Sequence, residues 1–264
     1  MDRAPIDLIV DVGNTRLKAA VFERGRSLAQ AAMPHEGYAG ITSLLGGRRP
    51  RAIAMASTAH ARPDLLRFLE DLGPVLQVTG GTPAPVTNGY ATPATLGADR
   101  LANACGAWTF LPGRPSLVID AGTCITYDLV DGGGVFRGGA IAPGLRMRAT
   151  AMHAYSARLP EVDPGEQPPL IGADTLECLA SGVHHGMVME VQGYVSALRQ
   201  QYPGLAVVLT GGDAPRFARA LKNGIFAHPS LTLLGLHAIL HLHFPPGGPV
   251  AAGRAPGPSG PERG

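Results

Sequence analysis

The chain has 264 residues, of which 45% are apolar and 16% are charged, with a formal net charge of +2. This length suits one large or two modest domains, and the apolar content is ample for a buried core. The near-balanced charge, without a basic patch, argues against nucleic acid as a partner. Three widely spaced cysteines, no apolar leader and no run of 18 apolar residues lead us to expect a cytoplasmic protein without membrane spans or structural disulfides.

The N-terminal part of the chain alternates strand and helix patterns. An apolar, β-branched strand at 6–10 leads into the turn Asp11-Val12-Gly13-Asn14-Thr15, and a returning strand is expected at 16–22. Further along, the pattern predicts strands at 51–57 and 75–78 and helices at 40–45, 63–72 and 99–108. A loop rich in Thr, Pro and Gly separates the last strand from the last helix, at 80–93.

A second hairpin repeats the first. A strand at 117–119 enters the turn Asp120-Ala121-Gly122-Thr123, and a returning strand follows at 125–130. The two aspartates are 109 positions apart, which is too far for a solenoid repeat and right for two copies of one domain. We therefore predict an α/β protein with domains at 1–114 and 115–244.

The remaining elements are predicted as helices at 175–200, 214–221 and 231–242, with a strand at 205–209. The segment 138–144 is predicted as a turn-rich strand segment, which fits either a loop over a cleft or a plain hairpin. Twelve of the twenty residues from 245 to 264 are Pro or Gly, so this tail is predicted to be disordered.

The two Asp turns have the chemistry of a phosphate site. A Gly after the Asp lets backbone N–H groups approach an oxyanion closely, Asn14 and Thr15 add donors, and Lys18 can neutralise phosphate charge. One such turn alone also fits an ordinary hairpin. Two facing turns would supply the carboxylates that magnesium takes alongside ATP oxygens. Neither a P-loop nor a Rossmann fingerprint is present.

Other segments allow both a structural and a functional interpretation. Asp99 could be a favourable charge at a helix start or a general base, and Arg100 could hold an anionic substrate. Gly211-Gly212 could be a simple strand-to-helix turn or a bare backbone surface for adenine. His237 and His241 are one helical turn apart, but no third ligand has suitable spacing, so we expect them to line a helix face without binding metal.

Together these motifs resemble the type III pantothenate kinases, over about residues 6–243. The matching segments are 11–18, Tyr90 with Pro93, 97–100 with Asn103, 120–123, 138–147, Thr175 with Ser181 and Gly182, 210–214 and 231–236. The resemblance implies two duplicated ribonuclease-H-like domains of the actin-like ATPase class, with an active-site cleft between them. It also implies ATP-dependent phosphorylation of pantothenate to 4'-phosphopantothenate, the first step of coenzyme A biosynthesis.

The resemblance further implies roles for individual residues. Asp11 would organise magnesium–ATP, and Asp120 would bind a monovalent cation, K⁺ or NH₄⁺. Asp99 would accept the proton of the pantothenate hydroxyl. ATP would be bound by Asp11, Val12, Gly13, Asn14, Thr15, Arg16, Leu17, Lys18 and Thr123, with Gly211 and Gly212 on the adenine side. Pantothenate would be bound by Tyr90, Gly97, Ala98, Asp99, Arg100 and Thr175, in a pocket at or near a homodimer contact.

Three alternatives stay open. A different kinase or phosphatase of the same superfamily, such as an acetate or sugar kinase, would carry larger insertions. A non-catalytic regulator with this fold would be favoured by missing carboxylates, although Asp11, Asp99 and Asp120 are all present. An actin-like assembly protein would need longer subdomains.

Overall fold

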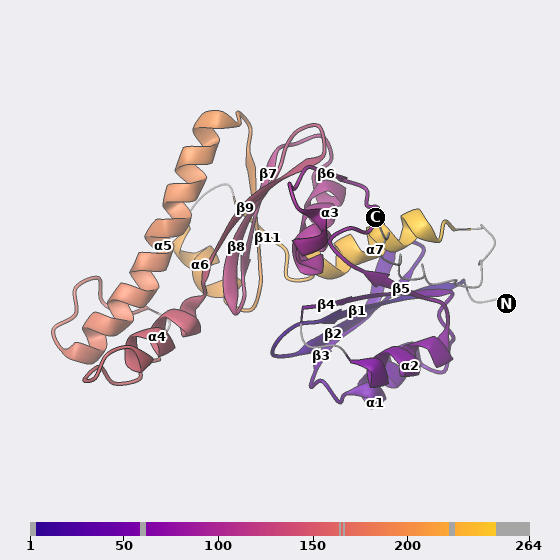
Figure 1. Ribbon diagram of the computed structural model, residues 1–264, viewed down its shortest axis with the longest axis horizontal. Coiled ribbons are helices and arrows are strands. Elements are labelled where there is room, and N and C mark those ends of the chain that lie inside the picture. The colour runs from indigo at the N-terminus through magenta and orange to yellow at the C-terminus, as the bar shows by residue number, and fades with distance from the viewer. Residues whose placement is uncertain (1–3, 59–61, 164, 166, 222–224, 247–264) are drawn as a thin grey trace, which may run out of the picture.

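The computed structural model describes residues 4–58, 62–163, 165, 167–221 and 225–246. Within these residues the chain forms two mixed sheets, with two helices between them and further helices on their outer faces (Figure 1). Most of the predicted tail lies outside the described residues. No helix of the described part is long and apolar enough to cross a membrane.

The first sheet has five strands in the order β3-β2-β1-β4-β5. All seven residues of β1 are buried, as expected for a central strand with both faces covered. β1 runs antiparallel to β2 and parallel to β4. The strands are β1 (Ile6–Val12), β2 (Leu17–Glu23), β3 (Arg26–Met33), β4 (Ala52–Ser57) and β5 (Val75–Val78).

The second sheet has six strands in the order β11-β10-β7-β8-β9-β6. Its strands β9-β8-β7-β10-β11 repeat the order and directions of β3-β2-β1-β4-β5, with β6 added at one edge. This repeated topology confirms the duplication predicted from the two hairpins. The strands are β6 (Thr87–Asn88), β7 (Ser116–Ala121), β8 (Cys124–Val130), β9 (Val135–Pro143), β10 (Ala206–Thr210) and β11 (Ile225–Ala227).

Successive side chains of β1 point to opposite faces of the first sheet, so the strand packs against helices on both faces. Leu8, Val10 and Val12 pack with the outer helices α1 and α2, whereas Ile9 packs with α3 and α7 between the sheets. On the outer face of the second sheet lie α4, α5 and α6 (Figure 1). The helices are α1 (Tyr38–Leu45), α2 (Pro63–Leu72), α3 (Ala98–Phe110), α4 (Leu145–Ala154), α5 (Thr175–Gln201), α6 (Ala214–Ala220) and α7 (Leu231–His243), with a short 3₁₀ turn at Pro93–Thr95.

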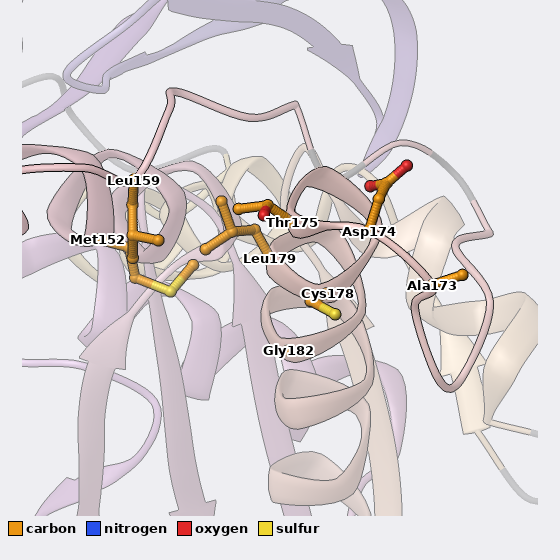
Figure 2. A pocket seen from close by; sticks show the side chains of 8 residues that line it. All are labelled: Met152, Leu159, Ala173, Asp174, Thr175, Cys178, Leu179 and Gly182. Atoms are coloured by element: carbon orange, nitrogen blue, oxygen red, sulfur yellow. The ribbon is translucent and has the colours of Figure 1, made fainter.

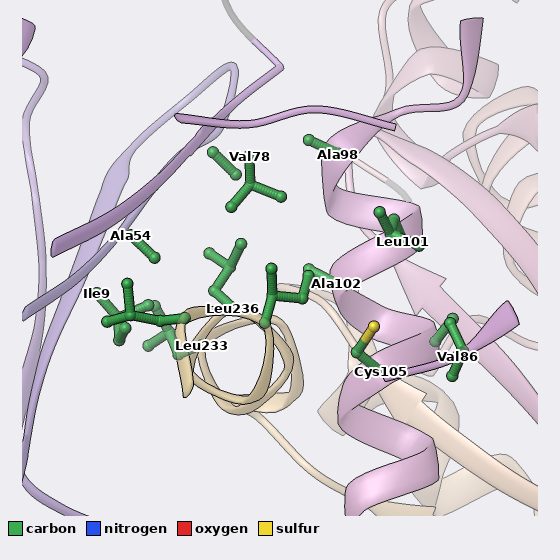
Figure 3. Packing of buried hydrophobic residues seen from close by; sticks show 14 of the residues in the cluster. Ile9, Ala54, Val78, Val86, Ala98, Leu101, Ala102, Cys105, Leu233 and Leu236 are labelled. Carbon is green, nitrogen blue, oxygen red and sulfur yellow. The ribbon is translucent and has the colours of Figure 1, made fainter. Parts of the chain in front are cut away.

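The two central helices approach each other closely because each has a glycine at the contact. A Cβ at Gly235 of α7 would lie 1.7 Å from the carbonyl oxygen of Ala102 in α3, and a Cβ at Gly106 would lie 2.4 Å from that of Leu231. Leu101 of α3 and Leu233 and Leu236 of α7 belong to the same buried cluster (Figure 3). The tight contact fixes α3, whose first turn contributes to the candidate site.

The structure adds elements that the sequence pattern did not predict. β3 was missed because only Met33 of its eight residues is buried, so it lacks alternating apolar residues. α4 was also missed. The predicted turn-rich strand segment 138–144 belongs to strand β9 and its end, and β9 pairs with β8 in a hairpin. The domain division at 114 stays a prediction: β6 joins the second sheet, and the C-terminal helix α7 packs on the first.

Candidate active site

The two Asp turns stand at equivalent places in the two sheets. Asp11 is the second-to-last residue of β1, and Asp120 is the second-to-last residue of β7. Burial raises the pKa of Asp11 to about 6; Lys18 lowers it, and the carboxylates of Asp99 and Asp120 raise it. Burial raises the pKa of Asp120 too; the Asp99 carboxylate adds to that rise, whereas Lys18 opposes it. Three carboxylates and one ammonium group from separate segments therefore share one site.

The first turn is open to solvent. The N–H of Gly13 donates to the carbonyl of Arg16 at 3.1 Å and closes the turn, which leaves Asn14, Thr15 and Arg16 exposed. Lys18 lies directly across the hairpin from Asp11. Val12 and Leu17 are buried in the core, so only their backbone groups can contact a nucleotide. Among the described residues, no side chain donates a hydrogen bond to the Asp11 carboxylate.

In the second turn, the Asp120 carboxylate contacts both a side chain of α3 and the backbone at Gly211. Asp120 Oδ2 accepts a hydrogen bond from Asn103 Nδ2 at 2.9 Å, and Asn103 Oδ1 accepts one from Thr232 Oγ1 at 2.8 Å. Gly211, with φ of +97°, lies so close that an added Cβ would be 2.5 Å from Asp120 Oδ1. Thr123 and Gly212 are exposed at the edge of this region. The Asp120 carboxylate is therefore held in one place.

The start of α3 supplies the third carboxylate. Asp99 Oδ1 accepts a hydrogen bond from the backbone N–H of Arg100 at 2.8 Å, and it lies 2.5 Å from where a Cβ of Gly97 would be. Glycine at 97 therefore makes room for this side chain, while Ala98 beside it is buried. Burial raises the pKa of Asp99, although backbone N–H groups and Arg100 oppose the shift. A raised pKa makes Asp99 a stronger base than an ordinary aspartate.

Arg100 is not the free cation that sequence reasoning expected. Its Nε and Nη2 lie 2.9 and 2.5 Å from Oδ1 of Asp128, which is fully buried. Burial raises the pKa of Asp128 to about 6 even with Arg100 beside it, which still leaves the carboxylate ionised at neutral pH. The guanidinium also lies over the ring of Tyr90, at 5.6 Å from its centroid. The two predicted pantothenate residues Tyr90 and Arg100 are thus brought together.

Sequence reasoning missed Asp128, although one signal was available. Asp128 stands within the apolar strand 124–130, and a charge in such a strand requires a partner. Strand alternation puts Ile125, Tyr127 and Leu129 in the core under α5, so Asp128 points to the opposite face, toward α3.

Thr175 lies apart from the other predicted site residues. It is exposed in the first turn of α5, beside the N-cap Asp174, where it lines a surface hollow with residues of α4 and the following loop (Figure 2). α5 covers the outer face of the second sheet, whereas α3 with Asp99 lies on its inner face (Figure 1). Within one chain, Thr175 and Asp99 therefore belong to helices that pack on opposite faces of the second sheet.

The donor set at the converging aspartates suits a metal–phosphate complex. Asp11 and Asp120 provide hard carboxylate oxygens, and burial raises the pKa of both groups. A divalent cation with phosphate oxygens and waters in its shell needs only one or two carboxylates. The residues present fit such a group.

Comparisons with known proteins agree with this chemistry. A family model described as type III pantothenate kinase matches residues 7–197. A type III pantothenate kinase of Bacteroides fragilis is 40% identical over 237 residues, which cover 89% of this chain and 98% of that protein. The enzyme of the same name from Flavobacterium psychrophilum is 38% identical over 232 residues, covering 87% and 96%.

Solved structures show the same fold at low sequence identity. A Campylobacter jejuni protein described as a Baf family transcriptional activator superposes with a TM-score of 0.59 at 19% identity, covering 89% of this chain and 98% of that one. A ROK hexokinase from Thermus thermophilus gives a TM-score of 0.52 at 17% identity, covering 90% and 99%. These likenesses confirm the predicted actin-like, sugar-kinase type of fold. By the family match and the 40% identity to its relatives, the chain belongs to the type III pantothenate kinase family.

Proposed function

We propose that this protein transfers the γ-phosphoryl group of ATP to the primary hydroxyl of pantothenate, the first step of coenzyme A biosynthesis. Membership of the family implies ATP with a divalent metal and pantothenate as acceptor. The observation that carries the proposal is the convergence of Asp11, Asp99 and Asp120, with Lys18 across the hairpin from Asp11. We place the reaction in the cytoplasm, in line with three free cysteines.

The nucleotide is assigned to the two Asp turns. Residues 11–18 and Thr123 would contact its phosphates, and adenine would lie against Gly211 and Gly212. Asp11, which has no hydrogen-bond donor among the described side chains, is the residue that would hold magnesium. Magnesium, when bound, neutralises phosphate charge. Asp120, braced by Asn103, is assigned to K⁺ or NH₄⁺.

The acceptor is assigned to the start of α3. Asp99 would accept the hydroxyl proton, and its raised pKa favours that role. Tyr90, Gly97 and Ala98 would line the same place. Because Asp128 already balances the charge of Arg100, we expect Arg100 to orient pantothenate through its remaining N–H groups and not through a free positive charge.

The transfer is an in-line displacement at the γ-phosphorus. The pantothenate hydroxyl oxygen bonds to the γ-phosphorus, the bond from that phosphorus to the β–γ bridging oxygen breaks, and ADP leaves. The hydroxyl proton passes to Asp99. Since the transition state is loose, positioning and charge neutralisation provide most of the rate enhancement.

We also propose that the active protein is a homodimer in which a second copy supplies Thr175. This follows from the separation of Thr175 from Asp99 within one chain. Large apolar side chains are exposed around α5 and before it, as a contact surface would require: Ile171 (83% exposed), Met189 (57%), Leu176 (51%) and Tyr194 (39%).

Mixed dimers test this arrangement. Asp99→Asn and Thr175→Val chains are each expected to be impaired alone. If Thr175 acts in trans, a mixed dimer contains one site with both native residues, so mixing the two proteins should restore activity. If Thr175 acts within its own chain, mixing restores nothing, and the shared-site proposal fails.

The activity itself is tested with a coupled assay that monitors ADP release in the presence of magnesium and potassium. ADP release that depends on pantothenate is the expected result, and its absence with both K⁺ and NH₄⁺ would defeat the assignment. Asp99→Asn should lower kcat roughly 10²-fold or more, the usual scale for loss of a general base. Asp71→Asn is a matched surface control. If Asp99→Asn keeps near-normal turnover, Asp99 is not the general base and only places a favourable charge at the start of α3.

A further inference from the structure

A second group of potential ligand atoms lies at the other end of β1. Asp7 is on the same face of β1 as Asp11, and α7 packs on that face with His237 and His241 one turn apart. His241 Nε2 is 3.1 Å from Asp7 Oδ2, and His237 Nε2 is 3.6 Å from it. One ligand atom from each of the three residues lies within 4.8 Å of the other two. Sequence reasoning found no third ligand for the histidine pair because Asp7 is 234 positions from His241.

We propose that Asp7, His237 and His241 bind one divalent transition-metal ion, with zinc as the expected occupant. Two imidazole nitrogens and one carboxylate oxygen are a ligand set that zinc commonly takes. With bonds of about 2.0–2.1 Å, neighbouring ligands of tetrahedral zinc are about 3.3 Å apart. The two measured separations, 3.1 and 3.6 Å, lie on either side of that value.

His237 provides a separate indication of a missing ligand. Its Nε2 is buried and has no hydrogen-bond partner among the described residues, since 3.6 Å to Asp7 is too long for a hydrogen bond. His237 as a whole is only 5% exposed, and its ring is stacked on that of Phe22 with the ring centroids 4.0 Å apart, so it cannot easily turn toward water. A buried nitrogen without a partner is costly, and an ion between the three side chains would satisfy it.

Arg51 shares the Asp7 carboxylate, including Oδ2, the oxygen that both histidines approach. Its Nε donates to Oδ1 and its Nη2 to Oδ2, each at 3.0 Å, and its Nη1 donates to the carbonyl of Phe244 at 2.7 Å. Such an outer hydrogen bond holds a ligating carboxylate in place. The guanidinium charge opposes the ion, so we expect weaker binding than at a site without it.

The site has an entrance and a structural consequence. The His241 side chain is 30% exposed, compared with 6% for His237 and 8% for Asp7, so an ion and a water ligand can enter beside His241. The ion would tie the first strand to the last helix of the described chain. Its main effect would therefore be on stability, because a metal that closes a long loop stabilises the folded state. This inference does not depend on the proposed kinase activity.

The test uses the full chain stripped of metal with a chelator and kept in excess magnesium, which occupies the active-site carboxylates. Zinc is titrated by calorimetry, and bound zinc is counted by elemental analysis after gel filtration. We expect one zinc per chain and, at about 100 times the dissociation constant, a rise in Tm of about 5 °C or more. His241→Ala and Asp7→Asn should each weaken zinc binding at least about 10-fold.

Two controls keep the result specific. His243→Ala, on the same helix with its Nε2 at the carbonyl of Pro83, and His185→Ala, from the other histidine pair, should both keep the zinc. Cobalt(II) added to the unmodified protein should give the visible absorption of a tetrahedral site, a readout that needs no variant. The proposal is overturned if the unmodified protein binds no zinc, or if zinc remains after His241→Ala but is lost after His185→Ala.

Discussion

The two Asp turns have the same local sequence pattern and the same place in their sheets, but their surroundings differ. Around the first turn, residues 14–16 are exposed, and the Asp11 carboxylate faces Lys18 with no side-chain hydrogen bond among the described residues. Around the second turn, Asn103 holds the Asp120 carboxylate, and Gly211 closes over it. The two similar hairpins therefore differ in their surroundings: the loop of the first is exposed, whereas the carboxylate of the second is held by its neighbours.

This difference supports different tasks for the two aspartates. A buried carboxylate that accepts no hydrogen bond from a described side chain, beside an exposed turn, can adjust to a metal–nucleotide complex that enters and leaves. A carboxylate held by an amide and by backbone suits an ion whose position must stay constant while substrates exchange.

Removing either carboxylate should be costly, but in separable ways. We expect Asp11→Asn to lower kcat/KM by about 10²–10³-fold and to raise the magnesium concentration needed for half-maximal rate. Asp120→Asn should cause a loss of similar size, but the remaining rate should no longer respond to K⁺. Initial rates measured against magnesium at fixed K⁺, and against K⁺ at fixed magnesium, separate the two. If Asp120→Asn shifts the magnesium curve and keeps the K⁺ response, the two roles are assigned wrongly.

A methyl group should disturb the second turn far more than the first. A Cβ at Gly211 would lie 2.5 Å from both the Ala121 carbonyl oxygen and Asp120 Oδ1, at a φ of +97° that alanine rarely adopts. We expect Gly211→Ala to lower the free energy of unfolding by about 2–4 kcal/mol, measured with urea. Gly13→Ala is the matched variant, because its Cβ would meet only the Arg16 carbonyl, at 3.3 Å. An equal loss for both variants would contradict the contrast in packing.

Local patterns in the sequence were enough to predict much of this fold. Strand β1 and its Asp turn are a continuous apolar run that ends at Gly, and α2 starts at a proline and spans the predicted residues. The repeat of the hairpin predicted the repeated sheet because strand, turn and returning strand all lie within about twenty residues. These features depend on neighbours in sequence, which is where pattern arguments are strongest.

The parts that could not be predicted depend on contacts between distant segments. Asp128 and Arg100 form a buried pair, but nothing in either segment identifies the other as its partner. Asp7 meets His241 only because α7 returns to the first sheet. Thr175 was placed with the pantothenate residues by resemblance alone, and its distance from Asp99 within one chain is what led to the shared-site proposal.

The buried Asp11 carboxylate of the first turn also lowers the stability of the folded protein, and this effect should depend on pH. The pKa of Asp11 is raised from 3.8 to about 6, mainly by burial, so the folded protein binds a proton more readily than the unfolded chain between these values. The free energy of unfolding therefore falls as pH rises from 3.8 to about 6. Above that pH the ionised Asp11 carboxylate is unfavourable to the folded protein. Asp11→Asn should raise the free energy of unfolding by about 1–3 kcal/mol at pH 7.5, without nucleotide or metal.

The same measurement at pH 4.5 should show a smaller difference, because Asp11 is then protonated in the folded protein. Asp71→Asn, at an exposed site, should leave stability unchanged at both pH values. A less stable Asp11→Asn protein at pH 7.5, or a gain that is the same at both pH values, would show that the Asp11 carboxylate is better balanced in the protein than the raised pKa indicates.

The smallest effect is expected from removing the Thr232 hydroxyl, which bonds to Asn103 and so acts on Asp120 only indirectly. Thr232→Val keeps the shape of the side chain but removes the hydroxyl that donates to Asn103 Oδ1 at 2.8 Å, so the Asn103 amide loses what fixes its orientation. We expect kcat to fall about 3–10-fold and the K⁺ response to weaken, from the loss of about 1 kcal/mol of hydrogen bonding. Thr109→Val is the control, because its hydroxyl bonds to the Cys105 carbonyl in the same helix as Asn103. Thr232→Ser should restore both properties. An unchanged K⁺ response in Thr232→Val would mean that packing alone orients Asn103, and the fixed character of the second turn would then come from Gly211 and not from helix α7.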